Sequence, residues 1–372
     1  MTFATPTSTV IIGAGIFGVS TAVQLARRGV AVTLINDGPV ANGASGRSLS
    51  WLNSSRRRSR EYHDLRMAGM DRYRTLSARL GRVDWLRFDG GLTWDADDES
   101  NGIAAAFAHE VSLGYDAVHL NADEIADWTP GTDTAAVTPE GAIFNPGEGW
   151  VDLPSLIAHL LTEFAALGGT LITDEGAAEV IAEDGRAIGA RTGNALHLAD
   201  VVMLATGPSV PAMAAKVGVR IDDGTPLALL IVTEPVEHPL RAVLNTPRVA
   251  IRPAPGNRFS LDADWAAVEG VAAKDGAYLV DPAVVEDLLA EASQVLEGHP
   301  RLKADRWGAG RKPIPGDGEP VIGAVTTLPG LYVAFSHSGA TLGLIVGEMA
   351  AYEIVTGVRH PMLATFRPER FA

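Results

Sequence analysis

The sequence predicts an α/β protein, and three observations carry that prediction. A short apolar stretch, Thr9–Ile12, runs directly into the glycines of a G-x-G-x-x-G turn at Gly13, Gly15 and Gly18. The 372 residues are rich in glycine but only 6% aromatic, a composition that suits α/β architecture better than a β-sandwich. An apolar strand, a small-residue turn and a helical pattern return near the other end, over 331–356. The length suffices for two closely joined domains.

Each glycine of the first turn has its own physical role. Gly13 permits the tight turn, Gly15 lets a pyrophosphate approach the backbone, and Gly18 lets the helix pack closely on the strand. An anion would then bind the free N–H groups at the positive end of the helix expected over 15–28. A strand over 31–35 completes a β-α-β unit of the dinucleotide-binding type.

The second strand of such a unit normally ends on an acidic residue that binds a ribose hydroxyl. Here Asn36 occupies that position and Asp37 follows it. An asparagine oxygen can still accept from a ribose hydroxyl. An asparagine in place of the usual acidic residue is therefore compatible with dinucleotide binding.

The remaining elements follow in order along the chain. Residues 42–48 form a small-residue loop with two hydroxyls and one guanidinium, suited to a phosphate-bearing cofactor. Apolar side chains at three- to four-residue spacing predict helices over 61–80, 101–113, 152–167, 281–296 and 341–356. Apolar or alternating runs predict strands over 170–173, 178–182, 187–191, 200–205, 227–233, 248–251, 258–261 and 331–335.

Charge and composition exclude several classes of protein. The net charge of −15 opposes binding to nucleic acid and to anionic membranes. The absence of cysteine excludes disulfides, thiolate metal sites and a cysteine-tethered cofactor. The first eight residues lack the pattern of a signal peptide, and no apolar run reaches about eighteen residues. We therefore expect a soluble cytoplasmic protein with no membrane span.

The order of motifs along the chain resembles the D-amino-acid oxidase superfamily, which includes glycine oxidase, sarcosine oxidase and D-amino-acid dehydrogenase. No single motif is unique to that family, but their order is specific, and the resemblance covers nearly the whole chain. The segments that carry it are Gly13–Gly18, Gly43–Ser48, Trp150–Pro154, Val202–Gly207, Asp317–Gly323, Gly330–Gly339 and Arg367–Phe371.

The resemblance implies an FAD-binding Rossmann-like domain of the glutathione-reductase type, with an interleaved α+β substrate domain built on a mixed sheet. The FAD-binding domain would be discontinuous, over 1–85, 147–225 and 300–372. The substrate-binding domain would take residues 86–146 and 226–299.

The resemblance also implies FAD held without a covalent bond. Some relatives tether the flavin through cysteine, which this chain lacks, and others through a histidine in the segment matched here by residues 47–60, which contains none. Amides at the start of the last helix would stabilise negative charge on the reduced flavin. Val180 has two interpretations, a backbone contact to adenine or an ordinary strand valine. The expected cofactor-binding residues are Gly13, Gly15, Ile16, Phe17, Gly18, Asn36, Asp37, Ala44, Ser45, Arg47, Ser48, Val180, Thr206, Gly207, Gly339, Ala340, Thr341 and Leu342.

For the reaction, the resemblance implies FAD-dependent oxidation of an amino acid or of a secondary or tertiary amine. A hydride would pass from the carbon next to nitrogen to flavin N5, and the resulting imine would hydrolyse in water. A substrate carboxylate needs a fixed cation. Many relatives carry an arginine for it where this chain has Lys312, preceded by Arg311. Adjacent strand residues face opposite ways, so one of the two would reach the substrate, unless both are solvated surface cations.

Two further residues are candidates for catalysis. Arg252 falls where the second domain would cover the flavin, or it is a surface arginine on an edge strand. His337 lies in the turn before the last helix and can accept a proton near neutral pH, or it is a structural turn residue. Ser260 falls where sarcosine oxidases carry a lysine that promotes the reaction with oxygen, which favours a dehydrogenase or a slow oxidase.

Two other functions remain open. One is an FAD-dependent 2-hydroxy-acid oxidoreductase, since some family members dehydrogenate alcohol carbons. The other is a flavin subunit of a hetero-oligomeric dehydrogenase. The partners we expect are a small-molecule amine or amino-acid substrate and other subunits of a homo- or hetero-oligomer, with no nucleic acid. The sequence predicts no metal site.

Overall fold

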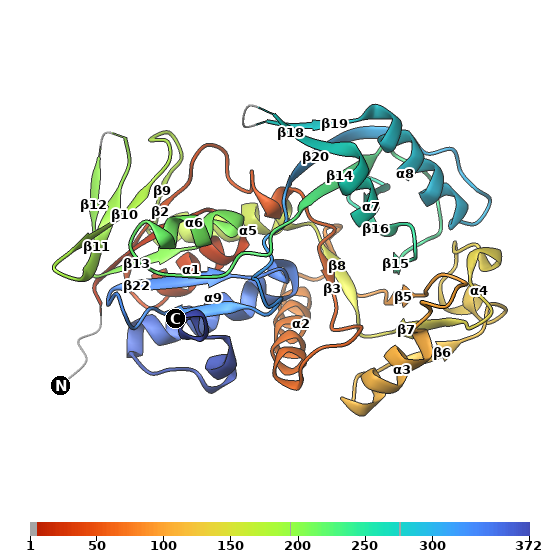
Figure 1. Ribbon diagram of the computed structural model, residues 1–372, viewed down its shortest axis with the longest axis horizontal. Coiled ribbons are helices and arrows are strands. Elements are labelled where there is room, and N and C mark those ends of the chain that lie inside the picture. The colour runs from red at the N-terminus through yellow and green to blue at the C-terminus, as the bar shows by residue number, and fades with distance from the viewer. Residues whose placement is uncertain (1–5, 194, 275–276) are drawn as a thin grey trace. The chain divides into compact units, whose positions relative to one another are not determined.

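A computed structural model describes residues 6–193, 195–274 and 277–372 (Figure 1). Helices and strands are intermixed along the chain, and several of the helices join strands of a largely parallel sheet, which confirms the α/β class. The first five residues, on which the expectation of no signal peptide partly depends, lie outside the described residues.

The chain divides into two compact units, each built from separated segments. Unit 1 contains Met1–Gly46, Leu153–Pro226 and Arg311–Ala372, and unit 2 contains Arg47–Asp152 and Leu227–Gly310. Residues 47–85, which we expected beside the glycine-rich turn, fall in unit 2 by this division. The assignment of cofactor binding and substrate binding to separate domains stays a prediction.

Unit 1 is built on a sheet of strand order β21-β22-β13-β1-β2-β9. Every neighbouring pair in it is parallel except β21 with β22. Buried valine, isoleucine and leucine predominate in these strands except β9, as expected of a sheet covered on both faces. The strands are β1 (Ser8–Ile12), β2 (Ala31–Ile35), β9 (Thr170–Ile172), β13 (Val201–Leu204), β21 (Val321–Ala324) and β22 (Leu331–Phe335).

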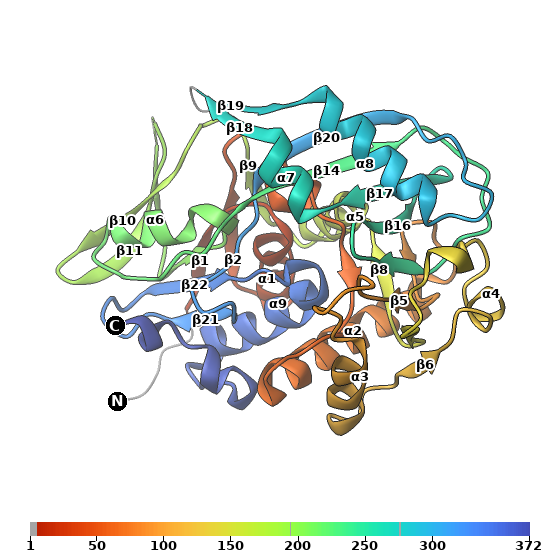
Figure 2. The same cartoon turned by 45° about the vertical axis from the view of Figure 1, so that its right-hand side comes forward.

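Helices α1 (Ile16–Ala26) and α9 (Gly339–Thr356) pack directly against one another and lie side by side in both views (Figures 1 and 2). Gly347 makes this contact close, because a Cβ there would lie 2.1 Å from Ser20 Oγ. Helix α5 (Leu153–Ala166) also packs on α1. The first helix is buried almost throughout, which matches its apolar sequence.

A second, antiparallel sheet of unit 1 has the order β10-β11-β12. Its strands are β10 (Glu179–Glu183), β11 (Arg186–Arg191) and β12 (Leu196–Leu198), and helix α6 is Val210–Ala215. Side chains of β11, α6 and the main sheet share one apolar core. The chain ends in two short 3₁₀ helices, Pro361–Phe366 and Pro368–Phe371.

Unit 2 is built on a mixed sheet of order β20-β14-β17-β16-β15-β5-β7-β6. Helices α7 (Asp264–Gly270) and α8 (Pro282–Gln294) pack together, α7 against β14 and α8 against β17 (Figure 2). The sheet strands are β5 (Gly91–Thr93), β6 (Val118–Leu120), β7 (Ala142–Asn145), β14 (Leu227–Thr233), β15 (Val243–Asn245), β16 (Ala250–Ala254), β17 (Arg258–Asp262) and β20 (Ala304–Arg311).

A small antiparallel sheet, β3-β8-β4, carries the tryptophan of the Gly-Trp-Val-Asp segment. Its strands are β3 (Trp51–Leu52), β4 (Leu86–Arg87) and β8 (Gly149–Val151). The other elements of unit 2 are α2 (Arg60–Leu80), α3 (Ile103–Ser112), α4 (Ile125–Trp128), Thr134–Ala136 as a 3₁₀ turn, β18 (Val271–Lys274) and β19 (Ala277–Val280).

Most expected elements are present, with ends displaced by one or two residues. Helix α9 begins at Gly339, two residues before the expected start. The strand expected over 248–251 begins at Ala250 and continues to Ala254 through Pro253, which the rule against proline in strands had excluded. Strand β20 was not expected, because its alternation of charged and small residues carries no apolar run.

In the described part of the chain, no single helix is long and apolar enough to cross a membrane. The helical segments Gly339–Thr356 and Pro361–Phe371 are long and apolar enough to cross a membrane only when taken together, and the chain bends by 98° between them.

Candidate functional site

Three parallel strands of unit 1 end at the same edge of the sheet. Strands β1, β13 and β22 are consecutive neighbours, so the residues that follow each of them meet at their carboxyl ends. Gly13 follows β1 with a φ of +108°, and a Cβ there would lie 2.5 Å from the carbonyl oxygen of Ala205 and 3.0 Å from Cα of Thr206. The glycine turn and the Thr206-Gly207 segment are therefore in contact, where ligands bind in open α/β sheets.

The other two glycines of the turn are also required by close approach. A Cβ on Gly18 would lie 1.8 Å from the carbonyl oxygen of Gly13. A Cβ on Gly15 would lie 3.2 Å from Ser45 Oγ, at the start of α1. The geometry at Gly13 and Gly18 fits the tight turn and the close packing expected of them, and the approach of a pyrophosphate to Gly15 stays a prediction.

Ser45 and Asn36 hold the turn in place. The amide of Ile16 lies in the first turn of α1, where the helix itself offers no acceptor, and it donates to Ser45 Oγ at 3.1 Å. The amide of Ala14 donates to Asn36 Oδ1 at 2.8 Å. Asn36 Nδ2 donates to the carbonyl oxygens of Gly38 and Pro39 at 3.0 and 2.8 Å. The side chain that we expected to bind a ribose thus also fixes the geometry of the glycine turn.

A second helix N-terminus lies at the same edge. Helix α9 begins at Gly339, directly after the turn that follows β22, and a Cβ on Gly339 would lie 3.7 Å from Cγ2 of Ile16. The first turns of α1 and α9 are thus neighbours within unit 1. Each turn begins at the positive end of a helix dipole, which attracts anionic groups.

Arg47, which we expected to hold a phosphate or the flavin edge, belongs to unit 2. Its side chain lies against Gly308 and Gly310 of β20, where a Cβ would lie 3.2 Å from Cδ and 2.7 Å from Nε of Arg47. Arg47 Nε is buried and has no hydrogen-bond partner among the described residues. A buried donor left unpaired is costly, so it calls for an acceptor from a bound group or water.

These observations fit FAD. Within unit 1, the glycine turn offers a cradle that a Cβ would fill, and two helix N-termini offer amides and positive dipole ends. FAD carries a pyrophosphate, a ribose and a flavin ring with carbonyl acceptors, so each of these features has a counterpart in it.

The remaining expected cofactor-binding residues lie at or near these elements. Ala340, Thr341 and Leu342 form the buried first turn of α9. Phe17 is buried in α1, Ala44 is in the short 3₁₀ turn beside Ser45, and Asp37 is exposed. Val180, half-buried in β10, packs against the core of unit 1. Ser48, in unit 2, accepts at Oγ from the amide of Ser50 at 3.0 Å.

The two candidate carboxylate anchors differ in their surroundings. Arg311 is the last residue of β20, and its Nη2 donates to Oδ2 of Asp223 at 2.7 Å. Burial acts to raise the pKa of Asp223, but hydrogen bonds from Thr225, together with the charge and hydrogen bond of Arg311, hold it below its ordinary value. Lys312, half-buried, follows the strand, and its amide donates to the carbonyl oxygen of Pro226 at 2.9 Å.

His337 is exposed in the turn between β22 and α9. Its neighbours Ser336 and Ser338 are buried, and the amide of Ser338 donates to Ser336 Oγ at 3.2 Å. The turn is therefore ordered by its serines and presents the imidazole outward from unit 1, two residues from the start of α9.

Arg252 is 2% exposed and lies on β16, between β15 and β17 in the sheet. The edge-strand interpretation is therefore wrong, because both sides of β16 are paired. Its guanidinium donates to the carbonyl oxygens of Leu49 and Pro253 and lies 3.4 Å from Asp152. Burial lowers its pKa to about 10, which the nearby Asp152 opposes. Within unit 2 this arginine joins three chain segments, and its contact with a substrate stays a prediction.

Sequence reasoning missed a buried polar cluster in unit 2. Tyr115 Oη donates to Oε1 of Glu148 at 2.5 Å and accepts from the amide of Ser54 at 3.0 Å. Ser54 Oγ lies 2.9 Å from His63 Nδ1, and the His63 and Tyr115 rings meet edge to face. Glu110, also buried, accepts from Arg56 N and Asn145 Nδ2 at 2.6 and 2.9 Å. No periodic pattern marks these residues, which come from distant segments.

Burial changes the ionisation of this cluster. Burial raises the pKa of Glu148 to about 8, with a contribution from the charge of Glu110. Burial also raises the pKa of Glu110 and that of Tyr115 above their ordinary values. Burial and the charge of Arg66 lower the pKa of the neighbouring Arg58 to about 10. The run of arginines at 56–60 is thus not uniformly solvated, since Arg56 also pairs with Asp95 at 2.6 Å.

No group of three or more His, Asp or Glu side chains within 6–193, 195–274 and 277–372 is placed to hold a metal ion.

A family model described as FAD dependent oxidoreductase (DAO) matches residues 8–353. The chain belongs to this family. It is therefore an FAD-dependent oxidoreductase, and the family resemblance, the class of enzyme and the FAD cofactor predicted from the sequence are confirmed.

Curated relatives and solved structures agree with this membership. The chain is 26% identical over 368 residues to the uncharacterized oxidoreductase YurR of Bacillus subtilis, covering 92% of this chain and 94% of that one. It is 24% identical to glycine oxidase of Bacillus licheniformis, covering 97% of each. The crystal structure of glycine oxidase from Geobacillus kaustophilus superimposes with a TM-score of 0.81 at 21% identity, covering 98% of each chain, and this likeness confirms the fold class.

Proposed function

We propose that this protein oxidises an amino acid or a secondary or tertiary amine at the carbon next to nitrogen. The observation that carries the proposal is the edge of the unit 1 sheet, where the glycine turn, Thr206 and the first turn of α9 lie together. Bound FAD supplies the acceptor for a hydride from that carbon, and the imine product hydrolyses in water. A relative named glycine oxidase, matched over 97% of its length, supports an amino-acid substrate.

The pyrophosphate would be bound by the glycine turn. Gly15 leaves its backbone accessible, and the amides of the first turn of α1 would donate to the anion. Ser45 Oγ already accepts from one of these amides and would be the nearest hydroxyl to a phosphate oxygen. Asn36 Oδ1 accepts one hydrogen bond, from the amide of Ala14, and its second lone pair would accept from the ribose.

The amides of the first turn of α9 would stabilise negative charge that develops on the flavin during reduction. Gly339 allows this turn to lie against the start of α1. Arg47 would add a donor, because its Nε is buried without a partner among the described residues. These groups would favour the reduced cofactor and so assist the first half of the reaction.

We assign the substrate carboxylate to Lys312 in preference to Arg311. The guanidinium of Arg311 is engaged by Asp223 at 2.7 Å, so using it for a substrate would expose a carboxylate that it now neutralises. Lys312 is the residue at the position where relatives place their carboxylate-binding arginine. A lysine binds as a compact charge rather than as a bidentate fork, which fits a less exacting substrate geometry.

His337 would accept the proton that an alkylammonium substrate must lose before hydride transfer. It is exposed in unit 1 and lies two residues before the start of α9. The histidine would therefore act on the substrate nitrogen and not on the cofactor.

An anaerobic substrate screen tests the proposal. Holoenzyme is mixed without oxygen with amino acids, secondary and tertiary amines, and 2-hydroxy acids, and the loss of flavin absorbance is recorded before air is admitted. We expect bleaching by members of the first two groups, and slow recolouring in air, because Ser260 stands in place of an oxygen-activating lysine.

Bleaching by hydroxy acids alone would contradict the proposal and favour the 2-hydroxy-acid reaction. No bleaching by any compound in a purified, flavin-loaded preparation would favour a flavin subunit that needs a partner. Fast recolouring in air would contradict the dehydrogenase-like behaviour without affecting the substrate class.

A further inference from the structure

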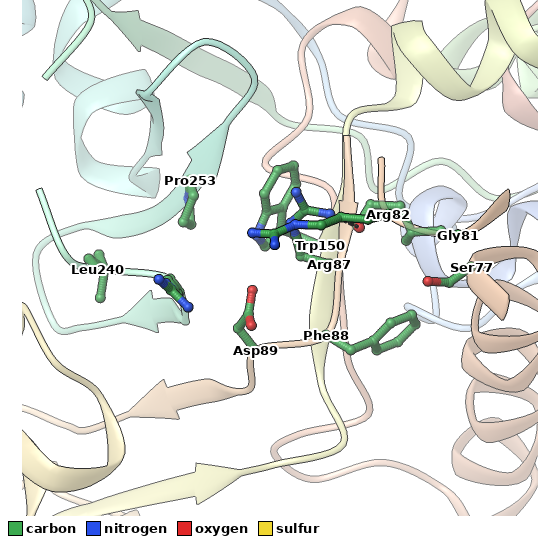
Figure 3. A pocket seen from close by; sticks show the side chains of 11 residues that line it. Ser77, Gly81, Arg82, Arg87, Phe88, Asp89, Trp150, Leu240 and Pro253 are labelled. Atoms are coloured by element: carbon green, nitrogen blue, oxygen red, sulfur yellow. Dashed lines mark hydrogen bonds between the residues drawn. The ribbon is translucent and has the colours of Figure 1, made fainter. Parts of the chain in front are cut away.

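A cavity of about 610 Å³ lies within unit 2, and none of its lining residues belongs to unit 1. Segment 81–89, which leaves α2 and enters β4, forms one side of it (Figure 3). Leu240 and Pro253 form the opposite side, Trp150 of β8 lies between the two sides, and Arg241 also lines the cavity. The proposed function uses none of these residues.

The cavity gathers positive charge in an acidic protein. Arg82, Arg87 and Arg241 line it, and Asp89 is the acidic residue among its lining side chains. Figure 3 shows the side chains of Arg82 and Arg87 gathered beside Trp150, with the Asp89 carboxylate directed toward them. Lining charges therefore sum to an excess of positive charge, although the whole chain carries −15. Such a local excess attracts anions.

Two of these cations are uncompensated. Arg82 and Arg241 are exposed and make no ion pair or side-chain hydrogen bond with the residues that the structure describes. Arg87 differs, because its Nη1 donates to the carbonyl oxygens of Val83 and Leu86, which fixes the guanidinium at the cavity wall. One cation is thus held in place and two can adjust to a ligand.

Trp150 supplies a second, independent sign of a ligand. It is 3% exposed, and its Nε1 is buried with no hydrogen-bond partner in the described part of the chain. Trp150 and Arg87 are direct partners across the antiparallel pair β8–β4, which places both side chains on one face of that sheet. A buried indole N–H beside guanidinium groups lacks only an acceptor.

The indole is held rigidly from behind. The guanidinium of Arg252 lies 5.2 Å from the centre of the Trp150 ring, and Arg252 is itself tied to Leu49, Pro253 and Asp152. Leu86, Phe88, Leu240 and Pro253 add apolar surface to the lining, and Ser77 adds a hydroxyl. The cavity therefore offers several donors together with apolar side chains against which the body of a ligand could lie.

We propose that this cavity is a second ligand site, which binds an organic acid through its carboxylate. The carboxylate would accept from Trp150 Nε1 and from the guanidinium groups of Arg82, Arg87 and Arg241, and the apolar body of the acid would lie against Phe88 and Leu240. A carboxylate suits the site because every unpaired group there except Asp89 is a donor.

The probe that tests the site is 4-fluorophenylacetate, with 4-fluorophenylacetamide as its neutral counterpart. Binding to the holoenzyme is measured by ¹⁹F NMR and calorimetry, while the visible spectrum reports any binding that perturbs the flavin. The test variant is R82Q/R241Q. The control is R79Q, because Arg79 is exposed on the same helix as Ser77 but does not line the cavity.

We expect the acid to bind at a site that leaves the flavin spectrum unchanged. Its affinity should fall about tenfold or more in R82Q/R241Q, as loss of charge-assisted hydrogen bonds predicts, and stay unchanged in R79Q. The amide should bind about tenfold more weakly than the acid, and added salt should weaken the acid only. W150F should weaken the acid while R82Q/R241Q keeps its flavin and its catalytic activity.

Three results would overturn the proposal. The first is equal affinity of the wild-type protein and R82Q/R241Q for the acid. The second is equal affinity for acid and amide, which would show an apolar cleft without carboxylate recognition. The third is a single site whose occupancy follows the change in the flavin spectrum, which would place all binding beside the cofactor.

Discussion

The buried carboxyl of Glu148 predicts a specific dependence of stability on pH, which the substitution Glu148→Gln should remove. Glu148 is 0% exposed, and Tyr115 donates to its Oε1 at 2.5 Å. Burial raises its pKa to about 8, from an ordinary value of 4.5. Ionised Glu148 is therefore costly in the folded protein and not in the unfolded chain, where the carboxyl is in water.

The sign of the effect follows from proton binding. Between pH 4.5 and about 8 the folded state holds a proton on Glu148 that the unfolded state has lost. The contribution of Glu148 to stability is therefore complete below pH 4.5 and is lost as the pH rises to about 8. The slope is about −1.4 kcal/mol per pH unit, so the wild-type protein should lose about 2–3 kcal/mol between pH 6 and pH 9 from this group.

The assay is urea unfolding of the holoenzyme at pH 6 and pH 9, with a constant excess of FAD. Glu148→Gln should be about 2–3 kcal/mol more stable relative to wild type at pH 9 than at pH 6. Any loss of hydrogen bonding by the amide is independent of pH and cancels in that difference. Burial holds the pKa of Tyr115 well above its ordinary value, so Tyr115 stays protonated at both pH values.

The matched control is Glu99→Gln, since Glu99 is exposed and makes no side-chain hydrogen bond or ion pair with the described residues. It should change stability equally at the two pH values. A difference between wild type and Glu148→Gln that is the same at pH 6 and pH 9 would refute the reasoning, because it would mean that Glu148 ionises as readily in the folded protein as in water.

The remaining predictions concern the cofactor and the substrate. Acid precipitation should leave all yellow colour in the supernatant, because FAD is held without a covalent bond; a yellow pellet would contradict this. Lys312→Met should lower kcat/KM for acid substrates by tens- to hundreds-fold, a cost of about 2–4 kcal/mol, and spare their esters, whereas Arg311→Met should affect acid and ester alike. Equal effects of Lys312→Met on both would place the anchor elsewhere. His337→Gln should keep FAD but slow anaerobic flavin reduction and remove one limb of its pH profile; an unchanged profile would leave His337 a structural turn residue.

The sequence predicted the first β-α-β unit well, because its signals are local. Thr9–Ile12, the glycines after it and the strand over 31–35 each depend on neighbours a few residues away. The close approaches at Gly13 and Gly18 then follow from the turn itself. The return of the last strand and helix to the same sheet was expected from the resemblance and is present as β22 and α9.

What the sequence could not predict depends on contacts between distant segments. The sequence left open whether Arg252 covers the flavin or lies on the surface of an edge strand, and only the structure shows that β16 lies inside the sheet with the guanidinium buried. The partner of Tyr115 is Glu148, more than thirty residues away, and neither position belongs to a periodic pattern. The sequence identified Trp150 as part of a family motif. That its buried N–H has no acceptor among the described residues could be learned only from the structure, because it depends on which segments pack around the indole.

The most direct test of the central claim is a deuterium isotope effect on anaerobic flavin reduction. An amine or amino acid that bleaches the holoenzyme is prepared with deuterium on the carbon next to nitrogen, and the two forms are compared by stopped-flow absorbance. The account predicts slower bleaching with the deuterated form, together with release of the carbonyl product and the free amine or ammonia. Bleaching at equal rates, or bleaching by hydroxy acids with none by any amine, would contradict it.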